Sequence, residues 1–201
     1  MNALKQIYPA IMMTVALTII LGIIYPLVVT GLAHVLFKEK AMGSLIEKDG
    51  KVLGSRIIGQ PFGGPGYFHP RPSAAGNGYD AASSGGTNLG PTSRKLFETN
   101  VKAAAESLRE QSPTVPIPVD MVTASASGLD PHITPAAAEF QVPRVSKERG
   151  ISETEVRRLV REHTEGRQFG LLGEPRVNVL ELNLALDGIG DSCAEPVSHD
   201  Q

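Results

Sequence analysis

Residues 7–37 read IYPAIMMTVALTIILGIIYPLVVTGLAHVLF, and no Asp, Glu, Lys or Arg interrupts them. A bilayer core is crossed by about 20 apolar helical residues, so this run is long enough to span a membrane with some tilt or a kink. It shows no polar face, which argues against a helix of a soluble domain. We therefore predict a transmembrane helix over residues 7–37, preceded by a short segment, residues 1–6.

Pro26 lies inside this predicted span and has no backbone N–H to donate. It predicts a kink, and a carbonyl freed in lipid needs a partner, so we expect a neighbouring helix to supply one. Small or hydroxyl-bearing residues of the kind found where membrane helices pack accompany it: Thr14, Thr18, Gly22, Thr30 and Gly31.

A cleaved signal peptide is the alternative, because residues 31–33 (Gly-Leu-Ala) resemble a small-x-small cleavage site. The apolar part of a signal peptide is about 7 to 15 residues, about half of this run, so an uncleaved anchor is favoured. The sequence leaves open on which side of the membrane the C-terminal domain lies. Lys38, Lys40, Lys48, Lys51 and Arg56 follow the span and favour a cytoplasmic C-terminal side, but that rule weakens for long domains.

The whole chain has 201 residues, a net charge of −2 and 41% hydrophobic residues. The length fits one ordinary domain with an appendage. The charge provides no general basic surface, so no nucleic-acid partner is expected. Cys193 is the only cysteine of the sequence, which excludes an intrachain disulfide and a thiolate-rich zinc site. We assign residues 38–187 to one mixed extramembrane domain and residues 188–201 to a disordered tail.

The first part of this domain combines a hairpin signal with a long loop. Asp49-Gly50 lies between two apolar-containing runs and predicts strands near 44–48 and 51–58. Residues 59–91 are rich in Gly and Pro, which excludes a long helix or a central strand. Four aromatic residues in this stretch predict an ordered, functional loop rather than a tether: Phe62, Tyr67, Phe68 and Tyr79.

Helical and strand patterns fill the middle of the domain. Residues 91–111 predict a helix, and residues 119–124 are a short strand candidate. The expected apolar face of that helix comprises Leu96, Phe97, Val101, Ala104, Ala105 and Leu108. Thr134 followed by Pro135 predicts the start of another helix.

The C-terminal part of the domain adds further helical signals and one strand pattern. Pro143 should divide the helix that begins after Thr134, and Gly150 should end it. Ser152 with Glu155 predicts a capping box for the next helix. The alternation within residues 176–186 predicts a strand. The resulting fold class is α+β, with a single N-terminal transmembrane helix followed by one mixed α/β extramembrane domain.

Two loops carry residues that could form a site. Residues 84–91 read SGGTNLGP, and consecutive glycines before a helix can bind an anion through backbone N–H groups. The motif has no P-loop lysine, which favours a structural turn in which Asn88 bonds its own backbone. The candidate residues of this loop are Ser84, Gly85, Gly86 and Asn88.

Residues 125–132 read SASGLDPH and bring Ser, Asp and His close in sequence. No G-x-S-x-G motif surrounds any serine, and Asp130 and His132 flank a proline. We therefore expect Asp130 and His132 to organise a tight turn and to cap the helix after Thr134, rather than to form a hydrolase triad. A metal site from His69, Asp130 and His132 is equally weak, because the sequence has no paired-His helix motif. We assign no catalytic residue and no metal ligand.

Taken together, the motifs of this sequence resemble those of the KdpC family, the C subunit of the Kdp potassium-pumping P-type ATPase of bacteria. The resemblance covers the chain from the apolar run to Asp187. It rests on Ile58-Gly59-Gln60, Tyr67-Phe68, Arg71-Pro72-Ser73-Ala74, residues 84–91, Val122-Thr123-Ala124-Ser125, Gly128-Leu129-Asp130-Pro131-His132-Ile133, Gln141, Arg144-Val145, Gly173-Glu174-Pro175-Arg176-Val177-Asn178-Val179-Leu180, Leu182-Asn183 and Leu186-Asp187.

The resemblance implies a non-catalytic accessory subunit of a high-affinity potassium import complex in the bacterial inner membrane, with its domain in the periplasm. The implied partners are an ATP-hydrolysing P-type subunit, a channel-like subunit that handles the potassium, a small single-span subunit and membrane lipid. The implied role is assembly of the pump and action as a catalytic chaperone that raises the ATP affinity of the hydrolysing subunit.

The resemblance also implies a nucleotide contact at Gln141, so ATP is a possible but not firmly bound cofactor. A periplasmic domain cannot touch cytoplasmic ATP, and an effect on ATP would then be allosteric. The two loops, through Ser84, Gly85, Gly86, Asn88, Gly128, Asp130 and His132, are expected to contact partners instead. The alternative function is a stand-alone, membrane-anchored periplasmic binding module or hydrolase.

Overall fold

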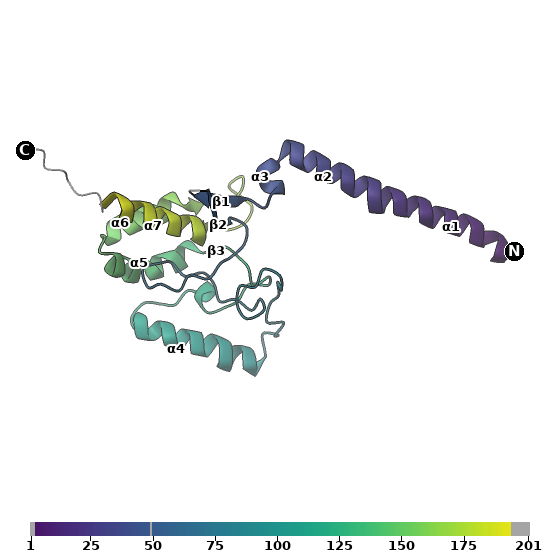
Figure 1. Ribbon diagram of the computed structural model, residues 1–201. Coiled ribbons are helices and arrows are strands. Elements are labelled where there is room, and N and C mark those ends of the chain that lie inside the picture. The colour runs from purple at the N-terminus through teal and green to yellow at the C-terminus, as the bar shows by residue number, and fades with distance from the viewer. Residues whose placement is uncertain (1–2, 49, 194–201) are drawn as a thin grey trace, which may run out of the picture. The chain divides into compact units, whose positions relative to one another are not determined.

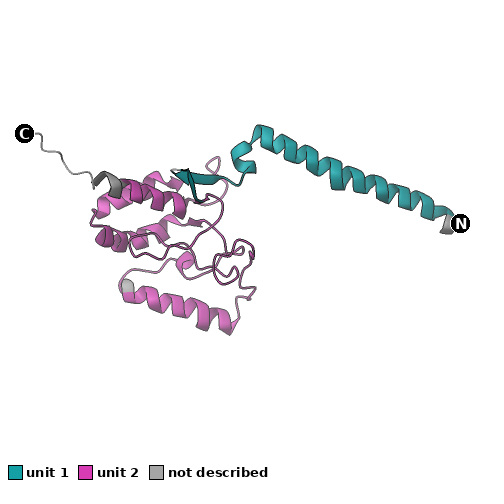
Figure 2. Cartoon of the chain, viewed as in Figure 1, with its two compact units in different colours: residues 1–53 teal, residues 54–201 magenta. Residues whose placement is uncertain are grey.

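The computed structural model describes residues 3–48 and 50–193. The chain divides into two compact units, residues 1–53 and residues 54–201, which Figure 2 shows in different colours. The first unit contains the predicted span, and the second contains most of the predicted extramembrane domain. Each unit is described separately below.

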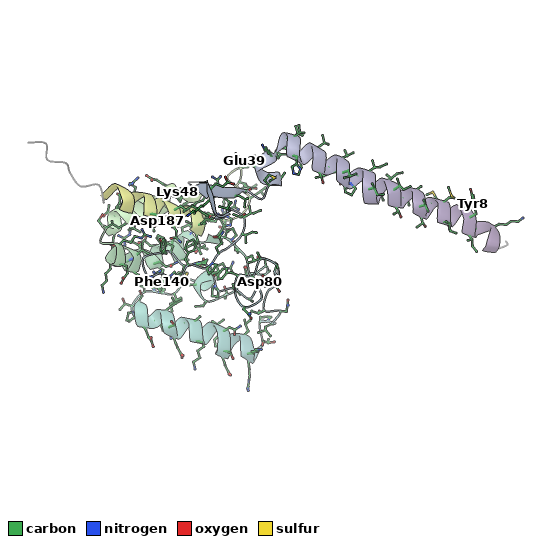
Figure 3. The ribbon with its side chains drawn as sticks, viewed as in Figure 1. Tyr8, Glu39, Lys48, Asp80, Phe140 and Asp187 are labelled. Carbon is green, nitrogen blue, oxygen red and sulfur yellow. The ribbon has the colours of Figure 1, made fainter. Side chains whose placement is uncertain are left out.

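The first unit is dominated by a long apolar helix built from α1 (Ala3–Ile19), η1 (Ile20–Ile24) and α2 (Tyr25–Leu36). Its segment Lys5–Leu36 comprises 32 residues and, in the part of the chain that the structure describes, is the one helix long and apolar enough to cross a membrane. Its side chains point outward all along the helix, as Tyr8 does (Figure 3). Such a surface is stable in lipid rather than in water.

Pro26 is accommodated by a change of helix type. The five residues Ile20–Ile24 form a π-helical turn, and the Tyr25 N–H donates to the Ile20 carbonyl at its end. This wider turn shifts the hydrogen-bond register immediately before the proline, which lacks an N–H and would crowd the carbonyl four residues back. Where the sequence predicted a kink at Pro26, the structure shows a π-helical turn within a continuous helix.

Three polar side chains of the span form hydrogen bonds within their own helix. The Thr14 hydroxyl donates to the Ala10 carbonyl at 2.9 Å, and the Thr18 hydroxyl donates to the Thr14 carbonyl at 2.8 Å. The Nδ1 atom of His34 lies 2.9 Å from the Thr30 carbonyl oxygen. Such bonds lower the cost of a polar group in an apolar environment.

A short helix and a hairpin follow the span. Helix α3 covers Lys38–Ala41, and strands β1 (Leu45–Lys48) and β2 (Lys51–Ser55) form a two-stranded sheet. The predicted hairpin is confirmed, although the second strand ends at Ser55 and not near residue 58.

The second unit combines helices with a small antiparallel sheet (Figure 1). Its sheet has the order β3-β5-β4, with His132 opposite Asn178 and Thr164 opposite Val177. Its elements are η2 (Lys95–Val101), α4 (Lys102–Gln111), η3 (Val119–Met121), β3 (His132–Ile133), α5 (Pro135–Arg149), α6 (Glu153–Glu162), β4 (Thr164–Glu165), β5 (Arg176–Asn178) and α7 (Val179–Cys193). The α+β class is confirmed.

The core of the second unit lies between helices α5, α6 and α7 and strand β5. Phe68, from the long loop, is fully buried in it, and α4 touches it through Leu108. Burial of these apolar side chains is the main favourable contribution to folding. The other core residues are Met121, Ile133, Ala137, Ala138, Val142, Val145, Val156, Leu159, Val160, Val177, Val179, Leu182 and Leu186.

The predicted helix ends of α5 and α6 are confirmed. The Thr134 hydroxyl accepts from the Ala137 N–H at 3.1 Å, and α5 then begins at Pro135. Helix α5 ends at Gly150, whose φ of +66° is the left-handed conformation that glycine adopts most easily. The Ser152 hydroxyl accepts from the Glu155 N–H at 3.2 Å at the start of α6.

Pro143 does not divide α5, contrary to the sequence prediction, because the helix runs unbroken through it. The missing N–H would have paired with the Glu139 carbonyl. Both residues lie on the exposed face, where water replaces the lost bond. Val142 and Val145, fully buried on the opposite face, hold the helix in the core.

The predicted strand over residues 176–186 is also wrong beyond Asn178. The Asn178 carboxamide oxygen accepts from the Glu181 N–H at 3.2 Å and starts helix α7. Val179, Leu182 and Leu186 are buried at helical spacing, so the apparent alternation was one face of a helix. Helix α7 continues to Cys193, so residues 188–193 are helical and not a disordered tail, and residues 194–201 lie outside the described residues.

Two further predictions need correction. Residues 119–121 form the 3₁₀ turn η3 rather than a strand, and Asp120 and Met121 within it are buried. The helix predicted from residue 91 begins with a π-helical segment at Lys95. That segment alters the spacing of the apolar face, and Phe97 is 66% exposed instead of facing the domain.

Candidate functional site

The long loop of residues 59–91 is held by two side-chain carboxamides, which form hydrogen bonds with the backbone of two consecutive residues. Asn183 of α7 accepts from the Phe68 N–H at 2.8 Å and donates to the Phe68 carbonyl at 3.0 Å. Gln141 of α5 accepts from the His69 N–H at 2.8 Å and donates to the His69 carbonyl at 3.1 Å. A carboxamide carries an N–H donor and a C=O acceptor, as a peptide group does. The two side chains therefore form the hydrogen bonds that a neighbouring strand would otherwise form with the loop backbone.

Two arginines of α5 fix the preceding turn of the same loop. Arg144 donates to the Pro65 carbonyl and, at 2.7 Å, to the Gln141 carboxamide oxygen. Burial lowers the pKa of Arg144, although Glu148 opposes this effect. The loop residues 59–91 are therefore ordered by contacts with helices, as predicted.

Arg149 forms the second of these contacts. Its guanidinium donates to the Gly66 carbonyl at 2.7 Å, pairs with Asp187 at 2.8 Å and lies 4.5 Å from the centre of the Tyr67 ring. The Tyr67 hydroxyl also donates to Asp187, at 3.3 Å. Arg149 thus joins the loop to both α5 and α7 through an ion pair, a hydrogen bond and a cation–π contact.

The structure places Gln141 inside the domain. The residue is 2% exposed, and its amide nitrogen also donates to the Ala137 carbonyl at 3.2 Å. The cavity beside it, which His69 and Met121 help to line, has a volume of about 20 Å³. Pockets that hold small ligands are typically about 300–1,000 Å³. In this conformation Gln141 positions the loop, and the space beside it is too small for a nucleotide.

His69, the other residue of this contact, has an unusual environment. Its Nε2 atom lies 3.0 Å from the Gly64 carbonyl oxygen. Burial lowers the pKa of His69 below its ordinary value of 6.5, and the charge of Arg144 lowers it further, while the bond to Gly64 opposes both effects. The imidazole is thus kept neutral, with the proton on Nε2 that the bond to Gly64 requires.

The structure brings the two predicted loops together. Gly85 donates its N–H to the Ser127 carbonyl at 2.9 Å, and the Ser84 hydroxyl donates to the same oxygen at 3.0 Å. A Cβ atom on Gly86 would lie 2.9 Å from the Ala126 carbonyl oxygen, and one on Gly128 would lie 2.6 Å from that of Gly85. These glycines serve close packing between the loops.

Asn88 differs from its neighbours in this loop. It adopts a positive φ of 52° and is exposed, whereas Gly85 and Gly86 are partly buried. Asparagine tolerates this backbone conformation better than most residues. Of the predicted contact residues of the glycine-rich loop, Ser84 and Asn88 remain on the surface.

A serine that the sequence analysis did not single out organises the same region. The Ser73 hydroxyl donates to the Gly128 carbonyl at 2.6 Å and accepts from the Tyr79 N–H at 2.8 Å. The Tyr79 hydroxyl donates to the Arg71 carbonyl, and burial raises the pKa of Tyr79 to about 12. Ser73 also accepts from the Ala75 N–H at 3.2 Å, so its local bonds shape the loop while its bond to Gly128 joins the loop to a distant segment.

Asp130 and His132 form the predicted tight turn, but they do not cap helix α5, because Thr134 is its N-cap residue. The Asp130 carboxylate accepts from the His132 N–H at 3.0 Å, lies 3.4 Å from His132 Nδ1 and pairs with Arg71 at 3.3 Å. Burial raises the pKa of Asp130, but the hydrogen bonds from His132 and the charge of Arg71 outweigh it, so the pKa is lowered overall. The carboxylate is therefore ionised, and its oxygens are paired with His132 and Arg71.

Arg71, Asp130 and His132 border a cavity of about 310 Å³ in the second unit. Arg176 and Glu174 line it as well, and Thr134 lies at its base with its N–H bonded to the buried Asp120 carboxylate at 2.7 Å. Charges of both signs share the cavity wall. Among the described residues, no group of three or more His, Cys, Asp or Glu is arranged to hold a metal ion.

An apolar helix long enough to cross a membrane, followed by a folded domain whose polar residues mainly hold loops, is typical of a membrane-anchored protein. The family model described as "KdpC: K+-transporting ATPase, c chain" matches residues 7–188, and the chain belongs to this family. It is 64% identical to the potassium-transporting ATPase KdpC subunit of Koribacter versatilis, over 92% of this chain and 95% of that protein. It is 56% identical to the KdpC subunit of Acidobacterium capsulatum, over 93% of this chain and 98% of that protein.

Proposed function

We propose that this chain is a non-catalytic, single-pass subunit that assembles and supports a potassium-importing ATPase. The observation that carries the proposal is the family match, which extends from the apolar helix through strand β5 and most of α7. The subunits that we expect around it are the ATP-hydrolysing P-type chain, a channel-like chain that handles the potassium and a small single-span chain.

Assembly is tested by purification of the tagged full-length chain from membranes. We expect the large subunits to copurify in fixed ratio and potassium-stimulated ATP hydrolysis to require this chain. A chain that purifies alone and retains an activity of its own would instead support the alternative of a stand-alone binding module or hydrolase.

The domain is further proposed to lie in the periplasm of the bacterial inner membrane. The resemblance to the KdpC family supports this arrangement, and the lysines that follow the span do not exclude it, since long domains are translocated largely regardless of nearby positive charge. A reporter that is active only in the periplasm, fused after Gln201, should be active. Activity of a cytoplasm-only reporter at the same place would reverse the orientation.

We propose in addition that the subunit raises the ATP affinity of the pump without touching ATP. The burial of Gln141 and its bonds to His69 support an allosteric route, in which the subunit favours one conformation of its partner. Gln141→Ala should weaken assembly or raise the KM for ATP of the complex. Lys147→Ala, at an exposed position of the same helix, is the control and should change neither.

Nucleotide binding to the purified full-length chain in nanodiscs separates the two routes. A fluorescent ATP analogue should not bind to the chain alone. Binding that Gln141→Ala abolishes, in a variant with unchanged thermal unfolding, would establish direct contact and contradict the allosteric proposal.

A further inference from the structure

The π-helical turn in the span leaves one backbone carbonyl without its usual donor. In an α-helix the Leu21 carbonyl would accept from the N–H of Tyr25, four residues further on. The Tyr25 N–H donates instead to the Ile20 carbonyl. In a π-helix the donor would be residue 26, which is a proline and has no N–H. Among the described residues, neither backbone donor that normally reaches such a carbonyl is therefore left for Leu21.

The surroundings of the Leu21 carbonyl do not supply a simple substitute. The nearest hydroxyl before it, that of Thr18, already donates to the Thr14 carbonyl at 2.8 Å. Leu21 lies 16 residues from Lys5 and 15 from Leu36, the two ends of the apolar segment. At about 1.5 Å per residue, this places it near the midplane of a bilayer core about 30 Å thick, beyond the reach of interfacial water. A carbonyl without a donor is costly at that depth.

The chemistry of this carbonyl determines what can cover it. Lipid tails and apolar side chains have no donor, so the complementary group is a hydroxyl, carboxamide or ammonium side chain on a second transmembrane helix, at the same depth. Polar side chains at mid-membrane are rare and mark the paths of ions. Of the partners expected for this subunit, the channel-like chain that handles the potassium is the one whose task requires such side chains.

We infer that the Leu21 carbonyl accepts a hydrogen bond at mid-membrane from a polar side chain on a transmembrane helix of the channel-like subunit. This inference rests on the proposed function, which supplies that subunit. A proline at position 26 of an α-helix would free the Gly22 carbonyl, whereas the π turn frees that of Leu21. One directional bond at this depth would fix both the height and the rotation of the span against its partner, which apolar contacts alone leave loosely defined.

Site-specific photocrosslinking in the assembled membrane complex tests this inference. A helical side chain covers the turn that precedes its own Cα, so position 25 reports on the surface at the Leu21 carbonyl, while position 23 lies about half a turn away. A benzophenone amino acid replaces Tyr25 in one variant of the full-length chain and Ile23 in the matched control, and both side chains are exposed.

Illumination should join position 25, but not position 23, to the channel-like subunit, which mass spectrometry identifies. Crosslinks from position 25 to a different subunit or to lipid only, or crosslinks of equal yield from both positions, would overturn the inference.

Removal of the proline provides an independent measurement. Pro26→Ala supplies an N–H, so the helix itself can satisfy the Leu21 carbonyl in either the α or the π register. The affinity for the partner subunits should then fall by roughly 3- to 10-fold, the range expected for one hydrogen bond between membrane helices. Pro9→Ala, in the same helix but near the end of the span where water reaches the backbone, is the control and should leave the affinity unchanged.

The two proline variants also separate this inference from the proposed function. Unchanged affinity of Pro26→Ala, or an equal fall in both variants, contradicts the inference alone. Failure of the wild-type chain to copurify any pump subunit contradicts the proposed function.

Discussion

The long loop of residues 59–91 and the hairpin tip of residues 166–173 are both glycine-containing and irregular, yet the structure uses them in opposite ways. The first is fastened to two helices by carboxamides and arginines, with Phe68 fully buried. The second is fastened only to itself, and its Phe169 is 96% exposed. Loop composition alone therefore does not determine whether an aromatic residue is buried in the core or exposed on the surface.

The comparison implies that substitutions should lower stability more in the long loop than in residues 166–173. The largest effect is expected for Asn183→Ala, which removes both hydrogen bonds to Phe68. Each buried backbone group left without a partner costs about 1–3 kcal/mol, so the free energy of unfolding should fall by about 2–6 kcal/mol.

Urea unfolding of the full-length chain in nanodiscs, followed by circular dichroism, measures this change. Glu181→Ala on the same helix removes an exposed pair with Arg56 and should cost about 0–1 kcal/mol. A difference of less than about 1 kcal/mol between the two variants would show that the carboxamide does not hold the loop.

A pair of glycine substitutions compares the two regions directly. Gly128 and Gly170 both have positive φ, of 67° and 73°. A Cβ atom at Gly128 would lie 2.7 Å from the Ala75 backbone nitrogen, whereas one at Gly170 would meet nothing within 4 Å. Gly128→Ala should therefore cost about 2–5 kcal/mol from strain and overpacking, and Gly170→Ala about 1–2 kcal/mol from strain alone. Equal costs in the same unfolding assay would refute the distinction between a packed loop and a free tip.

Asp130→Ala should have a smaller effect on stability. It removes the turn bond to the His132 N–H and the ion pair with Arg71, both only partly buried, so about 0.5–2 kcal/mol is expected. Asp130→Asn keeps an oxygen for the turn bond and should cost less. If Asp130→Ala instead leaves the unfolding free energy unchanged but lowers the yield of the complex, this turn contacts a partner after all.

The smallest expected effect is a pH dependence that originates in the long loop. The pKa of His69 is lowered on folding, so the unfolded chain takes up a proton first as the pH falls below about 6.5. The contribution of His69 to the free energy of unfolding is therefore fully present above this pH, and it is lost as the pH falls toward the lower pKa of the folded state. His69→Gln can still donate to Gly64 but cannot titrate, and it should flatten the dependence in that window. A wild-type slope that persists in His69→Gln would assign it to another group.

The candidate site could be predicted only in part. The turn at Asp130 and His132 was recognisable because its bond joins residues two positions apart. The packing of Ser84, Gly85 and Gly86 against residues 126–128 was not, because sequence position does not show which loops meet. Gln141 could be selected from the family resemblance, but its bonds to His69 appear only when α5 lies beside the loop. Whether it also contacts a nucleotide stays a prediction.

The amino-acid sequence by itself determined the apolar span, the helix ends at Thr134, Gly150 and Ser152, and the family. Each of these depends on neighbouring residues or on a pattern repeated along the chain. Only the tertiary structure decided that Pro143 leaves α5 intact and that residues 179–186 are helical. It also decided which loop is buried, since Phe68 and His69 find their partners 115 and 72 residues away. Such partners come together only after the helices have packed, and their packing therefore decides which loop is buried in the fold and which remains exposed.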